Sequence, residues 1–487
     1  MIEGQGRVSI DAKKGRNTMS EGYKELKKKL LTSKKNGYDR ISDADRDAME
    51  TYCAGYIDFL NKGKTERLCA AEAVRMAEER GYRRYQRGDA VNAGDKLYVC
   101  NRGKAVTLIH VGKRPLSEGI QLAAAHIDSP RLDLKPTPLY EDKELAFLKT
   151  HYYGGIRKYQ WVTIPLELRG VIAMKDGSTI PVNVGAESGD PKLVITDLLP
   201  HLGQEQGKKP LSTAIPAETL NLLVGSRPIG DEDDSGRVKL AVMQLLNEKY
   251  GVTEDDFNSA ELEAVPASPA CEIGFDRSMI GAYGHDDRVC AYGALKALLD
   301  LSETPEKTAV CMLADKEEIG SEGVTGMRSA AFDTLLEDLC AAQGVTLRAC
   351  REKSFCLSAD VTAAFDPDYA DVYDKRNAAF LNYGIGLCKY TGARGKSGAS
   401  DADAETVAYA RRIFDEAGVI WQIAELGKVD AGGGGTVAAY MAQRNITTLD
   451  AGVPVLSMHA PFETVAKLDC YQMYRAALAV YRSAFPG

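Results

Sequence analysis

Residues 285–318 read HDDRVCAYGALKALLDLSETPEKTAVCMLADKEE. The first half of this stretch carries apolar residues at three- and four-residue spacing: Val289, Tyr292, Leu295 and Leu299. This spacing predicts a helix over residues 285–301, and the apolar run 308–314 predicts a buried strand. A helix that leads into a buried strand is the unit of an α/β sheet, so the stretch indicates the α/β fold class.

The same alternation continues through the second half of the chain. Short apolar runs predict further buried strands at residues 355–359 and 453–457, and residues 463–485 predict a long closing helix. The first hundred residues look mainly helical, with the helical spacing clearest in residues 23–31 and 45–60.

Residues 136–269 have a different character. Residues 171–184 alternate between apolar and polar positions around a Lys175-Asp176-Gly177-Ser178 turn, which predicts a β-hairpin. Loops rich in glycine, proline and acidic residues follow. We interpret this stretch as an inserted, mainly β domain, so that the α/β domain comprises residues 1–135 and 270–487.

The chain of 487 residues is long enough for two domains. Its formal net charge of −8 gives no sign of a nucleic-acid-binding surface, and no apolar run reaches the roughly 18 residues of a membrane span. The N-terminus, MIEGQGRVSIDAKKGRN, lacks the apolar segment of a secretory signal. The 11 cysteines form no CxxC pair, which fits a reducing compartment. We expect a cytoplasmic protein that binds neither nucleic acid nor membrane.

Histidines and acidic residues gather at the predicted strand ends and at the start of the predicted helix: His126, Asp128, Asp286, Asp287, Glu317, Glu318, Asp360 and His459. Ligands of open α/β sheets bind at the carboxyl ends of the strands. Acids gathered there would repel one another unless a cation neutralised them. Each such pair is common on protein surfaces when taken singly, but two of only six histidines in the chain end apolar strands beside acids. The mixed imidazole and carboxylate set suits a metal site, and ordinary surface pairs explain the spacing about equally well.

Five motifs follow one another along the chain: AHIDSPRLDLKP from Ala125, ETLNLLVGSRP from Glu218, ADKEEIGS from Ala314, SAD from Ser358 and LSMHAPFE from Leu456. Together they resemble the aspartyl aminopeptidase family of zinc metallopeptidases (metallopeptidase family eighteen), and they indicate a divergent, bacterial-type member. Their order and separation match the family over about residues 20–485.

The resemblance implies two divalent metal ions per subunit, zinc foremost, with cobalt or manganese as alternatives. The ligands carried over by position are His126 and Asp360 for one ion, Glu318 and His459 for the other, and Asp286 as a bridge between both. Glu317 is then the general base that acts on a bridging hydroxide, and Asp128 orients the imidazole of His126. The segment HDDRVCAY resembles a family segment that contains a cis peptide bond after the bridging aspartate.

The resemblance also implies a fold and an assembly. We expect a three-layer zinc-peptidase catalytic domain, with the inserted β domain acting as a dimerisation domain. Relatives build a tetrahedral dodecamer from such dimers, and their active sites face an interior chamber. The expected partners are therefore peptides with a free N-terminus and further copies of the chain.

Two departures from the family concern substrate recognition. Near Tyr153-Gly154-Gly155 the family carries a histidine that reaches the active site of a neighbouring subunit. Tyr159 stands at that position in an ungapped alignment, and His151 lies close by. Tyr159 could donate a hydrogen bond to the oxyanion or serve as a core aromatic residue. After the SAD motif, Ala363 and Asp366 stand where the family has histidines.

Three basic residues are candidates for binding an acidic first residue of the substrate: Lys389, Arg394 and Lys396. A cation there could pair with a substrate carboxylate, and a solvated basic loop explains the same residues equally well. The glycine run 432–435 lacks the lysine pattern of a phosphate-binding loop. A close backbone approach or a tight turn is expected there instead.

The leading interpretation is a metallo-aminopeptidase that hydrolyses the N-terminal residue of peptides, with acidic residues as candidate substrates. Two enzymatic alternatives are an aminopeptidase for neutral residues and a deacylase on the same scaffold. A third alternative is a non-catalytic assembly protein of the same fold. The intact set of five ligands plus Glu317 weighs against this third alternative.

Overall fold

The computed structural model describes residues 22–398 and 400–487. The N-terminal segment considered above for a secretory signal falls within residues 1–21 and lies outside the described residues. Within the described part of the chain, no helix has both the length and the apolar character needed to cross a membrane. Residues 22–30 form a helix, as the spacing over residues 23–31 predicts.

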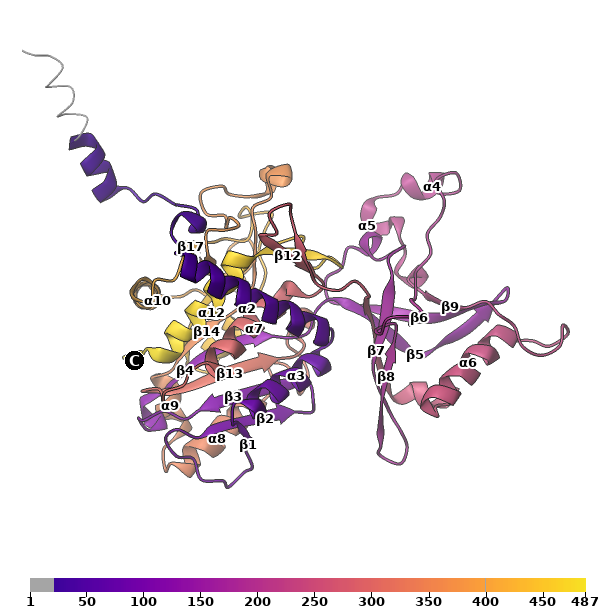
Figure 1. Ribbon diagram of the computed structural model, residues 1–487, viewed down its shortest axis with the longest axis horizontal. Coiled ribbons are helices and arrows are strands. Elements are labelled where there is room, and N and C mark those ends of the chain that lie inside the picture. Colours follow the sequence, from indigo (N-terminus) through magenta and orange to yellow (C-terminus); the bar gives the residue numbers. More distant parts are fainter. Residues whose placement is uncertain (1–21, 399) are drawn as a thin grey trace, which may run out of the picture.

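A nine-stranded mixed sheet forms the centre of the larger part of the molecule (Figure 1). In spatial order its strands are β1 (Arg83–Arg84), β2 (Lys96–Asn101), β3 (Ala105–His110), β13 (Thr308–Ala314), β4 (Ile120–His126), β14 (Phe355–Ser358), β18 (Thr447–Gly452), β16 (Ile385–Cys388) and β17 (Trp421–Ile423). The four inner strands β13, β4, β14 and β18 run parallel to one another. Strands β13 and β4 are buried along their whole length.

Apolar cores lie on both faces of this sheet, because successive side chains of a strand point to opposite faces. Ala123 and Ala125 of β4 share one core with α2 (Asp43–Lys62), α3 (Glu66–Glu79), α7 (His285–Leu299), α10 (Ala404–Glu416) and α12 (Lys467–Arg482). Leu122 and Ala124 share the other core with α8 (Ala331–Ala342), α9 (Leu347–Glu352) and α11 (Ala438–Gln443). The α/β class predicted from residues 285–318 is confirmed.

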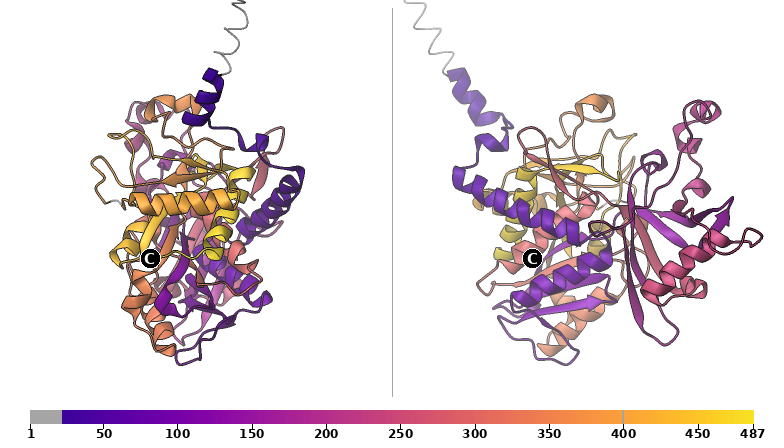
Figure 2. Two further views of the ribbon diagram at one scale, coloured as in Figure 1. Left: turned by 90° about the vertical axis from the view of Figure 1, so that its left-hand side faces the viewer. Right: turned by 45° about the vertical axis from the view of Figure 1, so that its right-hand side comes forward.

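A six-stranded antiparallel sheet lies beside this part of the molecule, as Figure 1 and the right panel of Figure 2 show. In spatial order its strands are β8 (Thr179–Val184), β7 (Leu166–Ala173), β10 (Ala260–Pro266), β5 (Arg131–Asp142), β6 (Leu145–Tyr153) and β9 (Leu222–Gly225). It has an apolar core of its own, to which α6 (Arg237–Tyr250) contributes, and it also carries the short helices α4 (Gln204–Gly207) and α5 (Leu211–Ala214). The predicted hairpin over residues 171–184 is confirmed, since β7 and β8 pair from Ala173 and Thr179 onward.

A third sheet contains β11 (Cys271–Ile273), β12 (Met279–Ala282), β20 (Glu463–Ala466), β19 (Pro454–Leu456) and β15 (Thr362–Ala363). The strand predicted at residues 453–457 is confirmed as β19, but it belongs to this sheet and not to the central one. The helix predicted over residues 463–485 is wrong in part. This segment begins with β20, which pairs antiparallel with β12, and only then becomes helix α12.

The expectation that the first hundred residues are mainly helical is also wrong in part. Helices α2 and α3 fit it, but residues 83–84 and 96–101 form β1 and β2. The six residues of β2, KLYVCN, are too few to show a strand period clearly beside the longer helical segments.

The central strands should dominate the stability of the fold. Leu313 of β13 is fully buried, so Leu313→Ala should lower the free energy of unfolding by about 2–5 kcal/mol. Leu26→Ala, at a leucine that is 55% exposed, is the matched control and should change it by less than about 0.5 kcal/mol. Urea denaturation of the full-length variants measures both values. Equal destabilisation by the two substitutions would contradict the assignment of β13 to the core.

Candidate metal centre

Two groups of candidate metal ligands share one residue. His126, Asp286 and Asp360 form the first group, and Asp286, Glu318 and His459 form the second. Within each group the ligand atoms all lie within 4.8 Å of one another. Oδ1 of Asp286 is 3.1 Å from Nε2 of His126, and its Oδ2 is 3.1 Å from Nε2 of His459. The Asp286 carboxylate therefore spans the two groups.

Neighbouring parallel strands deliver three of these side chains. His126 is the last residue of β4, Glu318 lies in the short 3₁₀ turn after β13, and Asp360 lies two residues after β14. Because β13, β4 and β14 are adjacent and parallel, their carboxyl ends meet at one edge of the sheet. Asp286 lies in the first turn of α7, and a cis peptide bond joins it to Asp287, as the resemblance implied.

His459 reaches the site from a different sheet, which the sequence did not predict. It follows β19, adopts a φ of +65°, and places Nδ1 2.9 Å from the carbonyl oxygen of Gly155. His126 is oriented in the same way, with Nδ1 3.1 Å from the carbonyl oxygen of Asp128. A donor N–H at each Nδ1 leaves Nε2 as the nitrogen that faces the acidic residues.

Asp128 is a fully buried carboxylate that contacts both a candidate ligand and the loop after β13. It accepts a hydrogen bond from the hydroxyl of Tyr153 at 2.8 Å, and its Oδ1 is 3.3 Å from Nδ1 of His126. It also accepts hydrogen bonds from the backbone N–H groups of Glu317 and Glu318, each at 3.2 Å. Asp128 therefore orients His126 and fixes the backbone that carries Glu317.

Glu463 is a buried carboxylate that the sequence analysis missed. Its oxygens accept hydrogen bonds from the backbone N–H groups of Asp286 at 3.0 Å and His459 at 2.6 Å. It thereby fixes the backbone of the shared aspartate and of the second histidine. Its place at the end of the LSMHAPFE motif, four residues after His459, is the signal that could have found it.

Burial raises the pKa of three acidic side chains beside Asp286. The pKa of Glu317 rises to about 7, and those of Glu318 and Asp360 rise well above their ordinary value. Oε1 of Glu318 is buried and has no hydrogen-bond partner among the described residues. A cation between these groups would favour their ionised forms and supply the missing partner. The donor set and the unpartnered oxygen fit a divalent metal ion.

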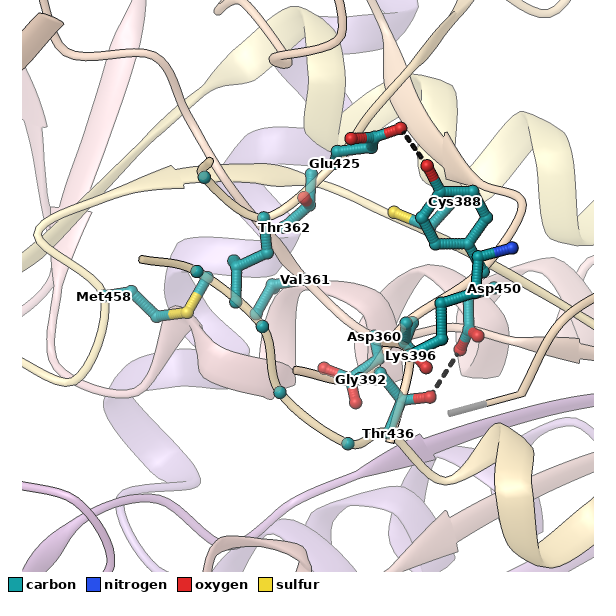
Figure 3. A pocket seen from close by; sticks show the side chains of 18 of the residues that line it. Asp360, Val361, Thr362, Cys388, Gly392, Lys396, Glu425, Thr436, Asp450 and Met458 are labelled. Atoms are coloured by element: carbon teal, nitrogen blue, oxygen red, sulfur yellow. Dashed lines mark hydrogen bonds between the residues drawn. The ribbon is translucent and has the colours of Figure 1, made fainter. Parts of the chain in front are cut away.

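A cavity of about 520 Å³ opens beside the two groups (Figure 3). One wall consists of Asp286, Glu317, Glu318, Asp360 and His459. Residues from the loops 388–396 and 425–436 line it as well, including the glycine run 432–435. A Cβ atom on Gly432 would lie 1.7 Å from the carbonyl oxygen of Leu426, so glycine is what allows these loop segments to pack closely.

The basic residues considered for substrate recognition lie in different settings. Arg394 and Lys396 line the cavity, and Lys396 also pairs with Asp401 at 2.9 Å. Lys389 pairs with Asp401 at 3.3 Å and is not among the described residues that line the cavity. Lys428, which the sequence analysis did not single out, does line it.

Tyr159 and His151 lie in the part of the chain that contains the six-stranded sheet. Tyr159 is 39% exposed, and the guanidinium of Arg157 lies 5.1 Å from the centre of its ring. His151 is exposed, with Nδ1 2.8 Å from the carbonyl oxygen of Tyr152. Neither residue is among those that line the cavity in the described part of this chain.

Comparisons with known proteins identify the family. The model of the family described as Aminopeptidase I zinc metalloprotease (M18) matches residues 59–481. A relative from Clostridium acetobutylicum, named a probable M18 family aminopeptidase 1, is 48% identical over 453 residues, covering 91% of this chain and 97% of the relative. The crystal structure of an M18 family aminopeptidase from Thermotoga maritima matches with a TM-score of 0.88 at 44% identity, covering 92% of this chain and 99% of that one. The mApe1 dodecamer of S. cerevisiae matches at 20% identity with a TM-score of 0.72, covering 90% and 98%, and shares the fold.

The family match includes Glu317 and all five candidate ligands, from His126 to His459. The family inferred from the five motifs is thus confirmed. This chain belongs to the M18 family of aminopeptidases, which are zinc metalloproteases.

Proposed function

We propose that this aminopeptidase removes the N-terminal residue of peptides at a centre of two metal ions. The observation that carries the proposal is the position of Asp286 between the two ligand groups. His126 and Asp360 would complete the site of one ion, and Glu318 and His459 that of the other. Zinc suits this mixture of imidazole and carboxylate donors, and cobalt or manganese could replace it.

Glu317 is the proposed general base. Metal ions bound at the centre would lower the pKa of a water molecule and polarise the scissile carbonyl group. Glu317 lines the same cavity, and its Oε2 lies 4.0 Å from Nε2 of His126. From this position its carboxylate can take a proton from the attacking water and deliver it to the leaving amine. Asp128 accepts a hydrogen bond from the backbone N–H of Glu317 and so positions the proposed base.

The acidic wall of the cavity favours substrates with a free N-terminus. A protonated α-amine gains charge-assisted hydrogen bonds beside carboxylates, whereas an internal peptide bond offers no such charge. The carboxylate of Glu317 lines this wall beside the proposed metal ligands Glu318 and Asp360. Release of single N-terminal residues is therefore the reaction that the cavity supports best.

We also propose a two-part organisation. Residues 1–135 and 270–487 would form a three-layer zinc-peptidase catalytic domain, and residues 136–269 an inserted β dimerisation domain. The separate apolar core of the six-stranded sheet supports this division, although strand β5 runs through the boundary at residue 135. Several exposed leucines in the inserted part could be covered by a second copy: Leu198, Leu199, Leu202, Leu240 and Leu245.

The dodecamer recorded for the S. cerevisiae relative supports the proposal of a dimer-based dodecamer for this chain. Tyr159 and His151 are exposed on the inserted part. In such an assembly either side chain could contact the cavity of a neighbouring subunit. Tyr159 remains the proposed counterpart of the family's histidine.

Glu317→Gln tests the assignment of the base. The amide cannot accept the proton, so kcat should fall by about 10²–10⁴-fold while the variant still binds two metal ions per subunit. Activity on an aminoacyl anilide and metal analysis of the same sample measure the two properties. Glu322→Gln is the matched control, because Glu322 is exposed and pairs with Arg328. Retained activity in Glu317→Gln would contradict the assignment.

Sedimentation velocity tests the assembly. The full-length protein should sediment as a particle of twelve copies. Leu240→Asp, on the exposed face of α6, should shift the particle to smaller species, because it buries a charge in the proposed contact. Leu26→Asp, outside the inserted part, should leave the sedimentation unchanged. A monomer at working concentration would overturn the proposed assembly.

A further inference from the structure

Asp450 is a buried acidic residue that lines the cavity and has no part in the proposed metal centre. It lies on β18, in register with Ser358 of β14 on one side and Cys388 of β16 on the other. Only 4% of its surface is exposed, yet it is one of the residues that line the cavity. Because Asp450 is far more buried than the loop residues around the cavity, it forms part of the cavity floor.

One hydrogen bond orients the carboxyl of Asp450 within the cavity. The hydroxyl of Thr436 donates to its Oδ1 at 2.7 Å, and Figure 3 shows this contact. Thr436 follows the glycine run 432–435, so the loop that narrows the cavity also holds the carboxyl in place. A carboxylate can accept about four hydrogen bonds, so this contact leaves capacity for a group of the substrate.

The basic residues of the cavity lie in a different environment from Asp450. Arg394, Lys396 and Lys428 are exposed, and Lys396 is already paired with Asp401. Charges in water at physiological salt interact weakly, whereas a buried carboxylate acts through a lower dielectric constant. The field at the floor of the cavity is therefore set by Asp450 more than by the basic residues at its mouth.

Burial raises the pKa of Asp450 to about 6. At neutral pH the group is therefore mostly ionised and accepts hydrogen bonds only. Cys388, its neighbour on β16, carries no charge that would neutralise it, and neither does the lining residue Thr362. The cavity volume of about 520 Å³ is within the range of sites that enclose small ligands, so an extended side chain fits it.

We propose that Asp450 selects the N-terminal residue of the substrate. The cavity would favour a side chain that ends in a positive charge or a strong hydrogen-bond donor, as in lysine and arginine. It would disfavour N-terminal aspartate and glutamate, whose carboxylates would face the Asp450 carboxylate. This inference rests on the proposed function, since it assigns the cavity to the first residue of a peptide.

The test compares p-nitroanilides of lysine, norleucine and glutamate with the zinc-loaded full-length enzyme. Lysine and norleucine have side chains of equal carbon length, so their kcat/KM ratio isolates the terminal charge. The wild type should cleave the lysine substrate faster than the glutamate one. Asp450→Asn should lower the lysine-to-norleucine ratio by about ten- to hundredfold, the effect of losing a hydrogen bond between charged groups.

Asp469→Asn is the matched control. Asp469 is also a buried carboxyl, but it accepts hydrogen bonds from the backbone N–H groups of Asn382 and Gly384. It is not among the described residues that line the cavity. The lysine-to-norleucine ratio of kcat/KM is measured within one variant, so a smaller fraction of folded enzyme lowers both values equally and leaves the ratio unchanged. Asp469→Asn should therefore keep the wild-type ratio.

A wild-type preference for glutamate over lysine would overturn the inference even if Asp450→Asn failed to fold. An unchanged ratio in a folded Asp450→Asn would do the same. In both cases the proposed function stands, because substrates are cleaved. Absence of cleavage of all three substrates, with zinc and with cobalt, would instead overturn the proposed function and the inference with it.

Discussion

The contact of the Asp286 carboxylate with two imidazoles is the interaction on which the rest of the site depends. Its oxygens lie 3.1 Å from His126 and 3.1 Å from His459, which come from two different sheets. The backbone around it is held on both sides: its N–H donates to Glu463, and its carbonyl oxygen accepts a hydrogen bond from the hydroxyl of Ser129 at 2.6 Å. The nine-stranded central sheet and the five-stranded sheet therefore both supply a histidine that contacts Asp286.

The electrostatic consequence is a set of acidic side chains that outnumbers the two imidazoles beside it, His126 and His459. Burial raises the pKa of Asp287, Glu318 and Asp360 well above the ordinary value, and Asp287 and Glu318 each keep a buried oxygen without a hydrogen-bond partner in the described part of the chain. Removing such groups from water costs several kcal/mol unless a cation compensates. A divalent metal ion, as in the zinc metalloproteases of this family, would therefore compensate the charge of these buried acids.

The sequence predicts the α/β class and a cluster of acids and histidines at the ends of the parallel strands, because an apolar run followed by an acid or histidine is a local pattern. The assignment of individual ligands rests on the family resemblance. It does not show that His459 comes from another sheet, since β19 has only three residues. The sequence predicts Glu463 as part of the closing helix, because β20 adjoins α12 directly. In the sequence, no feature distinguishes Asp450 from other residues of a strand. Its pairing with Ser358 and Cys388 in the folded sheet places it at the cavity. Which strands pair, and in which register, depends on contacts between residues far apart in the sequence. The spacing of residues within one segment does not show these contacts.

Diffraction from crystals soaked with zinc, at wavelengths on either side of the zinc absorption edge, distinguishes a shared centre of two metal ions from a single metal site. Two anomalous peaks per subunit are expected. One should be ligated by His126 and Asp360, the other by Glu318 and His459, with Asp286 contributing one oxygen to each. A single peak, or a pair in which Asp286 contacts only one ion, would contradict the shared centre.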